Sequence, residues 1–390
     1  MVLNLKEIRR NLFEQLDSVS SPLDLAIFQR ELCNAIFQAE GLKANTNNKI
    51  EKSNFGLHIR MCRSYGDAMV WNLLDSHSIR QMKVHDIPPP HLSGMKEVVN
   101  KYLELIEITA EKGGLAIIPD LTNIVQVGDV ILVHDSQVPM ILEIKGDKII
   151  TTLFNESEND SISINAKKVT GRLQKQLEKN RTITEYLIND EKEVDNGNFL
   201  LKAISGNSEL EHYWDKVDSV VREALEANNS TCIVSEGNII WATTEEPEDF
   251  ILPKDISDVF NSDSIIRIGN QLTPLEEANP YIKTPFNWEV SKEVRFALME
   301  GDVVLTNFVD ISKLVGLTIE NATILDVGIS GPEFDDEMIS VEVESELVKY
   351  SPVVLYRMVN GFITLESIGK FILNAAIDSH RIIKDLDGRA

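Results

Sequence analysis

Residues 128–145 have the sequence GDVILVHDSQVPMILEIK, in which two apolar runs flank a short polar segment. This pattern predicts two β-strands joined by a turn. If the turn is centred on Ser136, Ile131 faces Ile141 and Asp129 faces Glu143. Residues opposite one another in an antiparallel pair have Cβ atoms about 4.5–5.5 Å apart. Lys145 lies two positions beyond Glu143, so it is predicted to share the same face of the sheet.

This register would gather three charged side chains on a face that is otherwise apolar, because Ile131, Val133 and Ile141 are its other members. An isolated charge on an apolar surface is unfavourable, and two carboxylates close together repel each other unless a cation lies between them. The hairpin therefore predicts a site for a divalent metal ion between Asp129 and Glu143. An ordinary hairpin, with its charged residues in water at a strand end, is the alternative.

An acid on one strand followed by Glu-x-Lys on the next resembles the PD-(D/E)xK nuclease superfamily. The matching residues are Asp129 and the run Glu143-Ile144-Lys145, within a resemblance that covers roughly residues 95–245. Gly128 stands where the family usually has proline. The resemblance implies a restriction-endonuclease-like mixed sheet flanked by helices. It also implies that Asp129, Glu143 and the Ile144 carbonyl hold Mg²⁺ or Mn²⁺, and that Lys145 positions or deprotonates the attacking water.

The segment 166–187 has the composition of a helix, and its basic residues form one stripe at helical spacing. In this superfamily the helix after Glu-x-Lys commonly offers basic or Gln side chains to the substrate phosphate. A solvated helix face explains the same residues equally well. The residues expected to bind nucleic acid are Lys168, Arg172, Lys175, Gln176 and Lys179.

The helix before the first strand often supplies a further acid in this superfamily, and the sequence leaves its identity open. Glu97, Glu104 and Glu107 are available in the predicted helix 94–112, and Asp67 lies further upstream. Asp67 is also a candidate helix cap, with Arg60 and Arg63 nearby.

The chain of 390 residues contains 62 acidic and 38 basic residues, a formal net charge of −24. Such a charge argues against a protein that coats nucleic acid non-specifically, but not against a nuclease with a local basic cleft. The three cysteines lack zinc-ligand spacing and are predicted to be reduced core thiols. Neither a signal peptide nor a membrane-spanning run is expected, and the predicted location is cytoplasmic.

Three regions are predicted. Residues 1–114 form a helical N-terminal region, 115–245 the nuclease core, and 246–390 a separate C-terminal α+β domain that offers a surface for a homodimer or protein partner. In the first region, Ser21 is expected to cap a helix that stops at Gly41, and residues 43–54 are expected to form a loop.

Taken together, the sequence predicts an α/β fold of mixed α+β type. It also predicts an enzyme, a metal-dependent nuclease acting on nucleic acid, with DNA favoured over RNA. Restriction or phage defence is the expected biological setting. The alternative is a non-catalytic acidic interaction or scaffold protein in which the Glu-x-Lys hairpin is fortuitous.

Overall fold

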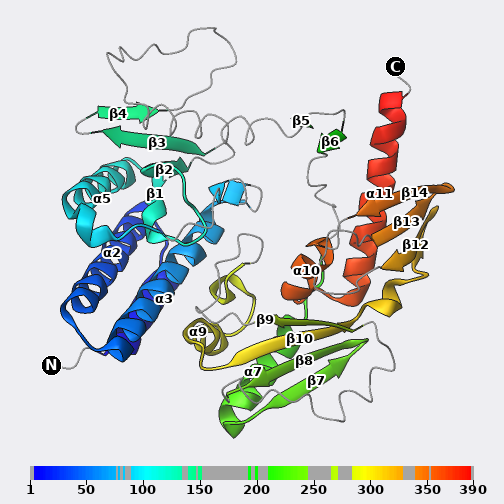
Figure 1. Ribbon diagram of the computed structural model, residues 1–390, viewed down its shortest axis with the longest axis horizontal. Coiled ribbons are helices and arrows are strands. Elements are labelled where there is room, and N and C mark those ends of the chain that lie inside the picture. The colour runs from blue at the N-terminus through cyan, green and yellow to red at the C-terminus, as the bar shows by residue number, and fades with distance from the viewer. Residues whose placement is uncertain are drawn as a thin grey trace. The chain divides into compact units, whose positions relative to one another are not determined.

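The structure is a computed structural model in which the chain forms two compact units (Figure 1). Unit 1 comprises residues 1–200 and 277–287, and unit 2 comprises 201–276 and 288–390. These limits differ from the region boundaries expected after residues 114 and 245. No helix in the described part of the chain is long and apolar enough to span a membrane. The residues described are 4–75, 78–79, 82–83, 89–133, 139–145, 148–151, 192–194, 198–200, 210–244, 265–270, 283–327, 339–350 and 353–387.

Unit 1 begins with three helices, α1 (Leu5–Asp17), α2 (Pro22–Asn45) and α3 (Lys49–Leu73). The Ser21 side chain accepts a hydrogen bond from the Asp24 amide at the start of α2, which confirms the predicted N-cap. The predicted stop at Gly41 is wrong, because α2 continues to Asn45. Helix α2 packs against α3 and α5, and this packing outweighs the roughly 1 kcal/mol preference for alanine over glycine in a helix.

The expected loop over residues 43–54 is confined to the three residues between α2 and α3. Asn48 caps α3 through a bond from the Ile50 amide to its Oδ1, and the polar residues beyond it are helical. The suggestion that Asp67 caps a new helix is also wrong, since α3 runs unbroken through it. The polar residues of 43–54 therefore belong mostly to the exposed end of α2 and the exposed start of α3, and not to a loop.

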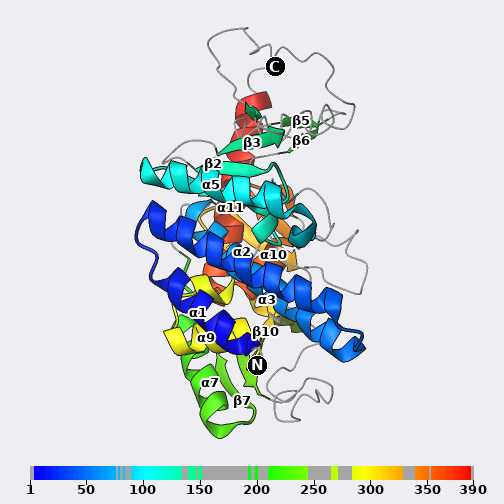
Figure 2. The ribbon, with the colours of Figure 1, turned by 90° about the vertical axis from the view of Figure 1, so that its left-hand side faces the viewer.

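Helix α5 (Lys96–Glu111), preceded by the short η1 (Leu92–Met95), leads into an antiparallel sheet with the strand order β1-β2-β3-β4. The strands are β1 (Leu115–Ile117), β2 (Val130–Val133), β3 (Met140–Lys145) and β4 (Lys148–Thr151). Of these, β2 and β3 are the two strands predicted from residues 128–145. Helix α5 lies against α2 and against β1, and Figure 2 shows α5 between α2 and the strands.

A side-chain amide anchors β1 to the helices. Gln29 of α2 is fully buried, and its Nε2 donates to the Ala116 carbonyl at 2.8 Å while its Oε1 accepts from the Ile118 amide at 2.9 Å. Gln29 thus satisfies a strand edge as a neighbouring strand would. A separate hairpin, β5 (Lys192–Val194) with β6 (Asn198–Leu200), completes the described strands of unit 1.

Unit 2 contains two four-stranded antiparallel sheets. In the first, β7 (Thr231–Ser235), β8 (Asn238–Thr243), β10 (Val304–Asp310) and β9 (Ile265–Asn270) lie in that order, with α7 (Trp214–Ala227) and α9 (Lys292–Glu300) in the same core. Strands β7 and β8 lie within residues 115–245, the predicted nuclease core, but they pair with each other and with β10 and not with the predicted hairpin. One of the three cysteines, Cys232 in β7, is exposed, so the expectation of a core thiol is wrong there.

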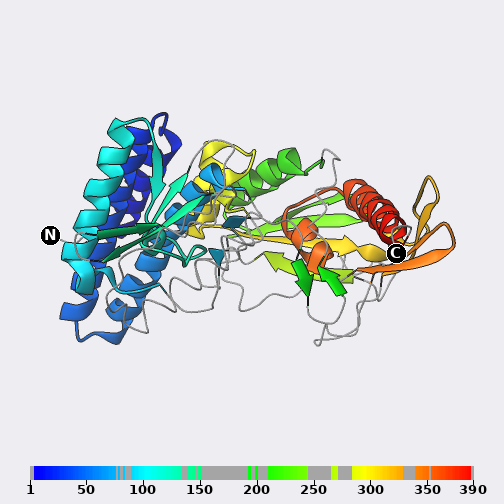
Figure 3. The same cartoon turned by 90° about the horizontal axis from the view of Figure 1, so that it is seen from above.

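The second sheet has the order β11-β12-β13-β14, and α11 (Leu365–Asp387) packs against β12 and β13 (Figure 3). Its strands are β11 (Thr318–Ile319), β12 (Ala322–Val327), β13 (Ile339–Val343) and β14 (Glu346–Tyr350), and α10 (Val353–Asn360) precedes α11. The fold class is therefore α+β, with antiparallel pairing in every described strand pair.

Candidate active site

The hairpin of β2 and β3 has the predicted register. Ile131 is paired with Ile141, and Val130 with Leu142. One step further, Glu143 is paired with Ile150 of β4 on its other side and is buried, with 3% of its surface exposed. The apolar alternation of the two runs was therefore enough to fix which residues oppose one another, because a shift by one residue would turn every side chain to the other face.

Asp129 lies just before β2, where the ladder becomes irregular. Its amide donates to the Leu142 carbonyl at 2.8 Å, and its Oδ2 accepts from the Ile144 amide at 2.5 Å. The carboxylate thus reaches across to the backbone of β3 next to Glu143. Asp129 and Glu143 are brought to the same end of the hairpin, as predicted, although Asp129 does so through a side-chain bond rather than a regular ladder position.

The backbone at Gly128, the residue before this acid, excludes proline. Its φ is +68°, in the left-handed region, whereas the proline ring holds φ near −65°. A Cβ at this position would lie 2.5 Å from Ile141 Cγ2 and 3.1 Å from the Leu142 carbonyl oxygen. Both the backbone conformation and the close approach of β3 require glycine here.

A third acid, Asp120, joins Asp129 and Glu143, and it was not among the predicted residues. It lies in the short helix η2 (Pro119–Leu121) directly after β1. The pKa of Asp120 is raised to about 6, chiefly by burial and also by the negative charges of Asp129 and Glu143, while the charge of Arg63 acts in the opposite direction. The three carboxyl groups are therefore close enough to interact. The signal in the sequence was the pair Pro119-Asp120, a literal Pro-Asp upstream of Glu-x-Lys.

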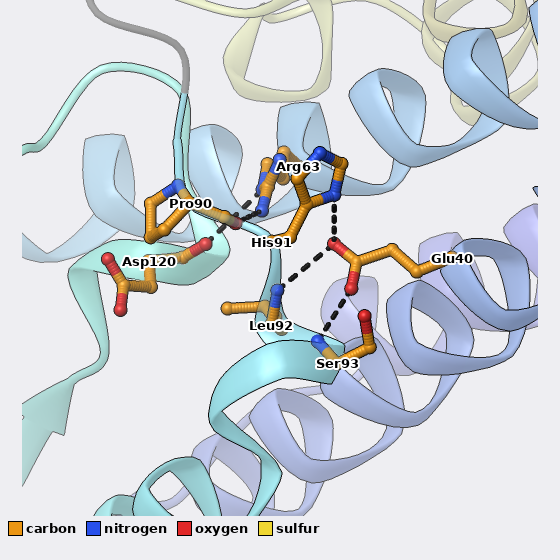
Figure 4. A network of polar contacts seen from close by, with 7 residues as sticks. All are labelled: Glu40, Arg63, Pro90, His91, Leu92, Ser93 and Asp120. Atoms are coloured by element: carbon orange, nitrogen blue, oxygen red, sulfur yellow. Dashed lines mark hydrogen bonds and ion pairs between the residues drawn. The ribbon is translucent and has the colours of Figure 1, made fainter. Parts of the chain in front are cut away.

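Arg63 of α3 holds the backbone of this acid rather than its carboxyl group. Its Nε donates to the Asp120 carbonyl at 3.2 Å and its terminal nitrogen Nη2 to the Pro90 carbonyl at 2.6 Å. Figure 4 shows the Asp120 carboxyl turned away from the guanidinium. The sequence indicated only that Arg63 lies near Asp67, and in the structure Arg63 anchors the backbone at Asp120 and Pro90.

Glu40 of α2 fixes the segment that follows Pro90. Its carboxylate accepts from the Leu92 amide at 3.1 Å and the Ser93 amide at 2.7 Å, and His91 Nδ1 lies 3.5 Å from the same carboxylate (Figure 4). These amides belong to the first turn of the helical segment that becomes α5, where backbone N–H groups lack helical partners. A buried carboxylate thus holds the start of α5.

Of the upstream acids left open by the sequence, two are engaged elsewhere. Glu107 pairs with Arg30 Nε at 2.6 Å on the α2–α5 contact. Asp67 is buried, and its carboxylate accepts from the amides of Asn123 and Ile124 and from the Asn123 side chain. The pKa of Asp67 is raised to about 6 because burial outweighs these bonds. Glu97 and Glu104 are exposed on α5.

Lys145 is the last residue of β3, and its backbone is paired with that of Lys148. The position of its side chain is not described. The predicted basic stripe lies wholly outside the described residues: Lys168, Arg172, Lys175, Gln176 and Lys179. Their assigned roles stay predictions.

Within the described residues, no three His, Cys, Asp or Glu side chains are placed so that they could together hold a metal ion. Any metal bound at Asp129 and Glu143 would thus take part of its coordination shell from backbone, water or substrate.

Comparison with known proteins gives no match: no family model fits this chain, and no curated protein or solved structure is significantly similar to it.

Proposed function

We propose that the chain is a metal-dependent nuclease with a PD-(D/E)xK-like core that hydrolyses phosphodiester bonds in nucleic acid, DNA in preference to RNA. The observation that carries the proposal is that the charges of Asp129 and Glu143 act on Asp120 at one end of the β1–β2–β3 sheet, where the Asp129 carboxylate also accepts from the Ile144 amide. The order of elements supports it, because a helix and three antiparallel strands place Glu-x-Lys on the strand after the first acid, as in the restriction-endonuclease-like fold. Restriction or phage defence is the setting we propose for the activity.

The cofactor that we propose for these acids is a Mg²⁺ or Mn²⁺ ion. Magnesium is usually held by one or two carboxylates together with waters and substrate phosphates, not by a cage of protein ligands. Two carboxylates, Asp129 and Glu143, with the Ile144 carbonyl are a set of that kind. An ionised carboxylate can accept about four hydrogen bonds, so the bond from the Ile144 amide leaves Asp129 able to bind an ion. A cation would also relieve the repulsion that these charges exert on Asp120.

When bound, such an ion polarises the scissile phosphate and lowers the pKa of a coordinated water. The protein groups then have distinct tasks. Glu143 and Asp129 bind the ion. Asp120, with a pKa raised to about 6, can take up or release a proton near neutral pH. Lys145 positions the attacking water or removes its proton. The basic residues of segment 166–187, Arg172 and Lys175 among them, bind the phosphate backbone.

The test is a cleavage assay with purified protein, Mg²⁺ or Mn²⁺, and a panel of single- and double-stranded DNA and RNA. We expect metal-dependent cleavage that EDTA abolishes. E143Q and D129N should each lower the rate by about a hundredfold or more, because a lost metal ligand removes several kcal/mol of charge stabilisation. The matched control is E104Q, which neutralises an exposed acid on α5.

Absence of cleavage on every substrate, with Mg²⁺ and Mn²⁺ alike, would overturn the proposal. The chain would then be better described as an acidic interaction or scaffold protein, the alternative that its net charge of −24 accommodates. Cleavage by E143Q at the wild-type rate would show that the protein is a nuclease but that Glu143 is not part of its active site.

A further inference from the structure

Strand β7 is an edge of its sheet (Figure 1). Among the strands that the structure describes, it is paired with β8 alone. Ile233 packs toward the core that contains α7, so its neighbours Cys232 and Val234 lie on the opposite face of the strand. Both are exposed, Val234 with 53% of its surface. An edge strand of this kind offers its main-chain groups to a further strand.

The turn after β7 determines which of its main-chain groups point outward. Ser235 is paired with Asn238, and the two residues between them, Glu236 and Gly237, have φ of +49° and +92°. Positive φ at both central positions is the mark of the type I′ turn in a two-residue hairpin loop. The residues that flank such a turn exchange hydrogen bonds, so Ser235 and Asn238 are a hydrogen-bonded pair.

Hydrogen-bonded and non-hydrogen-bonded pairs alternate along an antiparallel ladder. Counted back from Ser235, Ile233 is again hydrogen-bonded to β8, whereas Val234 and Cys232 are in non-hydrogen-bonded pairs with it. The N–H and C=O groups of Val234 and Cys232 therefore point away from β8. The edge thus presents a donor and an acceptor at each of two residues, placed evenly on either side of Ile233.

This edge also lacks charge. Residues 227–235 contain no charged side chain, although the whole chain has a net charge of −24. Edge strands are commonly protected by charged side chains, and β14 has this protection in the exposed Glu346 and Lys349. Two copies of so acidic a chain repel each other where their charged surfaces meet. An uncharged edge is therefore a place where two copies can approach.

The edge is self-complementary as well. A two-fold axis at Ile233 brings Cys232 of one copy opposite Val234 of the other, and both residues direct their main-chain groups outward. We propose that β7 pairs in this way with β7 of a second copy of this chain. The antiparallel edges exchange both N–H···O bonds in each of these pairs and join two four-stranded sheets into one. The proposal does not depend on nuclease activity.

The experiment is mild oxidation of full-length V234C, followed by electrophoresis without reductant. The Cα atoms of a hydrogen-bonded antiparallel pair lie about 5.5 Å apart, within the range that a disulfide bridges. The new thiol at position 234 of one copy should therefore bond to Cys232 of the other and give a covalent dimer. The remaining cysteines, Cys33 and Cys62, are buried.

The register of the pairing supplies the controls. In the wild type, Cys232 of one copy is offset from Cys232 of the other by two residues, about 8 Å, which is too far for a disulfide. The same offset separates the two thiols of C232S/V234C. Neither protein should cross-link. L347C, which replaces an equally exposed residue of β14 (56%), should not cross-link either.

Sedimentation equilibrium tests the pairing without cysteine chemistry. An interface of one short strand belongs to the small, transient class, so the wild type should dimerise as its concentration is raised. V234P removes an outward N–H from each edge and leaves the bonds to β8 in place, so it should stay monomeric. The matched control is L347P, which should dimerise like the wild type.

Leu347 is at an equivalent position in its own hairpin. Glu344 and Ser345, between the paired Val343 and Glu346, have φ of +51° and +72°, so the N–H of Leu347 also points outward. A wild type that is monomeric at every concentration, a V234P protein that still dimerises, or a V234C protein that cross-links no faster than L347C would each overturn the proposal.

Discussion

Replacement of Asp120 by asparagine should make the metal-free protein more stable at neutral pH. Asp120 has a folded-state pKa of about 6 against an ordinary value of 3.8, because it is partly buried beside two other carboxylates. The folded chain therefore holds this proton more tightly than the unfolded chain does. The free energy of unfolding therefore falls as the pH rises from about 4 to about 6. Above about pH 6 the whole cost of ionising Asp120 in the folded protein applies.

The size of the effect follows from the two pKa values. Linkage gives a penalty of about 0.1 kcal/mol at pH 3, about 1.6 kcal/mol at pH 5 and about 3 kcal/mol at pH 7.5. Asparagine resembles the protonated acid in shape and carries no charge. D120N should thus exceed the wild type in free energy of unfolding by about 3 kcal/mol at pH 7.5 and by about half of that at pH 5.

Denaturant unfolding in EDTA, followed by hydrogen exchange of peptides from α5 and β3, measures this quantity for unit 1 alone. The contrasting variant is D67N, because Asp67 also has a pKa raised to about 6. Its carboxylate, however, accepts three hydrogen bonds from Asn123 and Ile124, and an amide at position 67 would face the Asn123 amide as donor to donor. D67N should therefore be destabilised, by about 1–3 kcal/mol. A D120N protein no more stable than the wild type at pH 7.5 would refute the view that burial and the neighbouring carboxylates destabilise the ionised Asp120.

Three further predictions concern activity, substrate binding and the backbone. E143A and K145A should each abolish cleavage while circular dichroism shows a folded protein, and residual wild-type activity in either would exclude that side chain from the chemistry. Joint charge reversal at Arg172 and Lys175 should weaken nucleic-acid binding uniformly across sequences and flatten the slope of log K against log salt, whereas an unchanged slope would indicate a merely solvated helix. G128A should lose about 1–3 kcal/mol of stability in denaturant unfolding, because its φ of +68° and the 2.5 Å approach of Ile141 both oppose a Cβ; equal stability would show that the backbone relaxes there.

The sequence by itself determined the local elements. The alternation of apolar residues in 128–145 fixed the register of the hairpin, because one face is buried and a slip of one residue would expose it. Ser21 and Asp24 marked the start of α2 through a cap that involves only neighbouring residues. Each of these features depends on residues that are close in the chain, so a sequence pattern is enough to predict it.

Only the tertiary structure decided which residues join Asp129 and Glu143. Asp120 of η2 lies near enough to feel their charges, whereas Glu104 on α5 faces solvent. The continuation of α2 through Gly41 and the separation of β7 and β8 from the hairpin were settled in the same way. Such contacts depend on how helices and strands pack against one another. Packing contacts join segments that are far apart in the chain, so a local sequence pattern does not predict them. The residues that make up the site could therefore be identified only from the arrangement of the helices and strands in space.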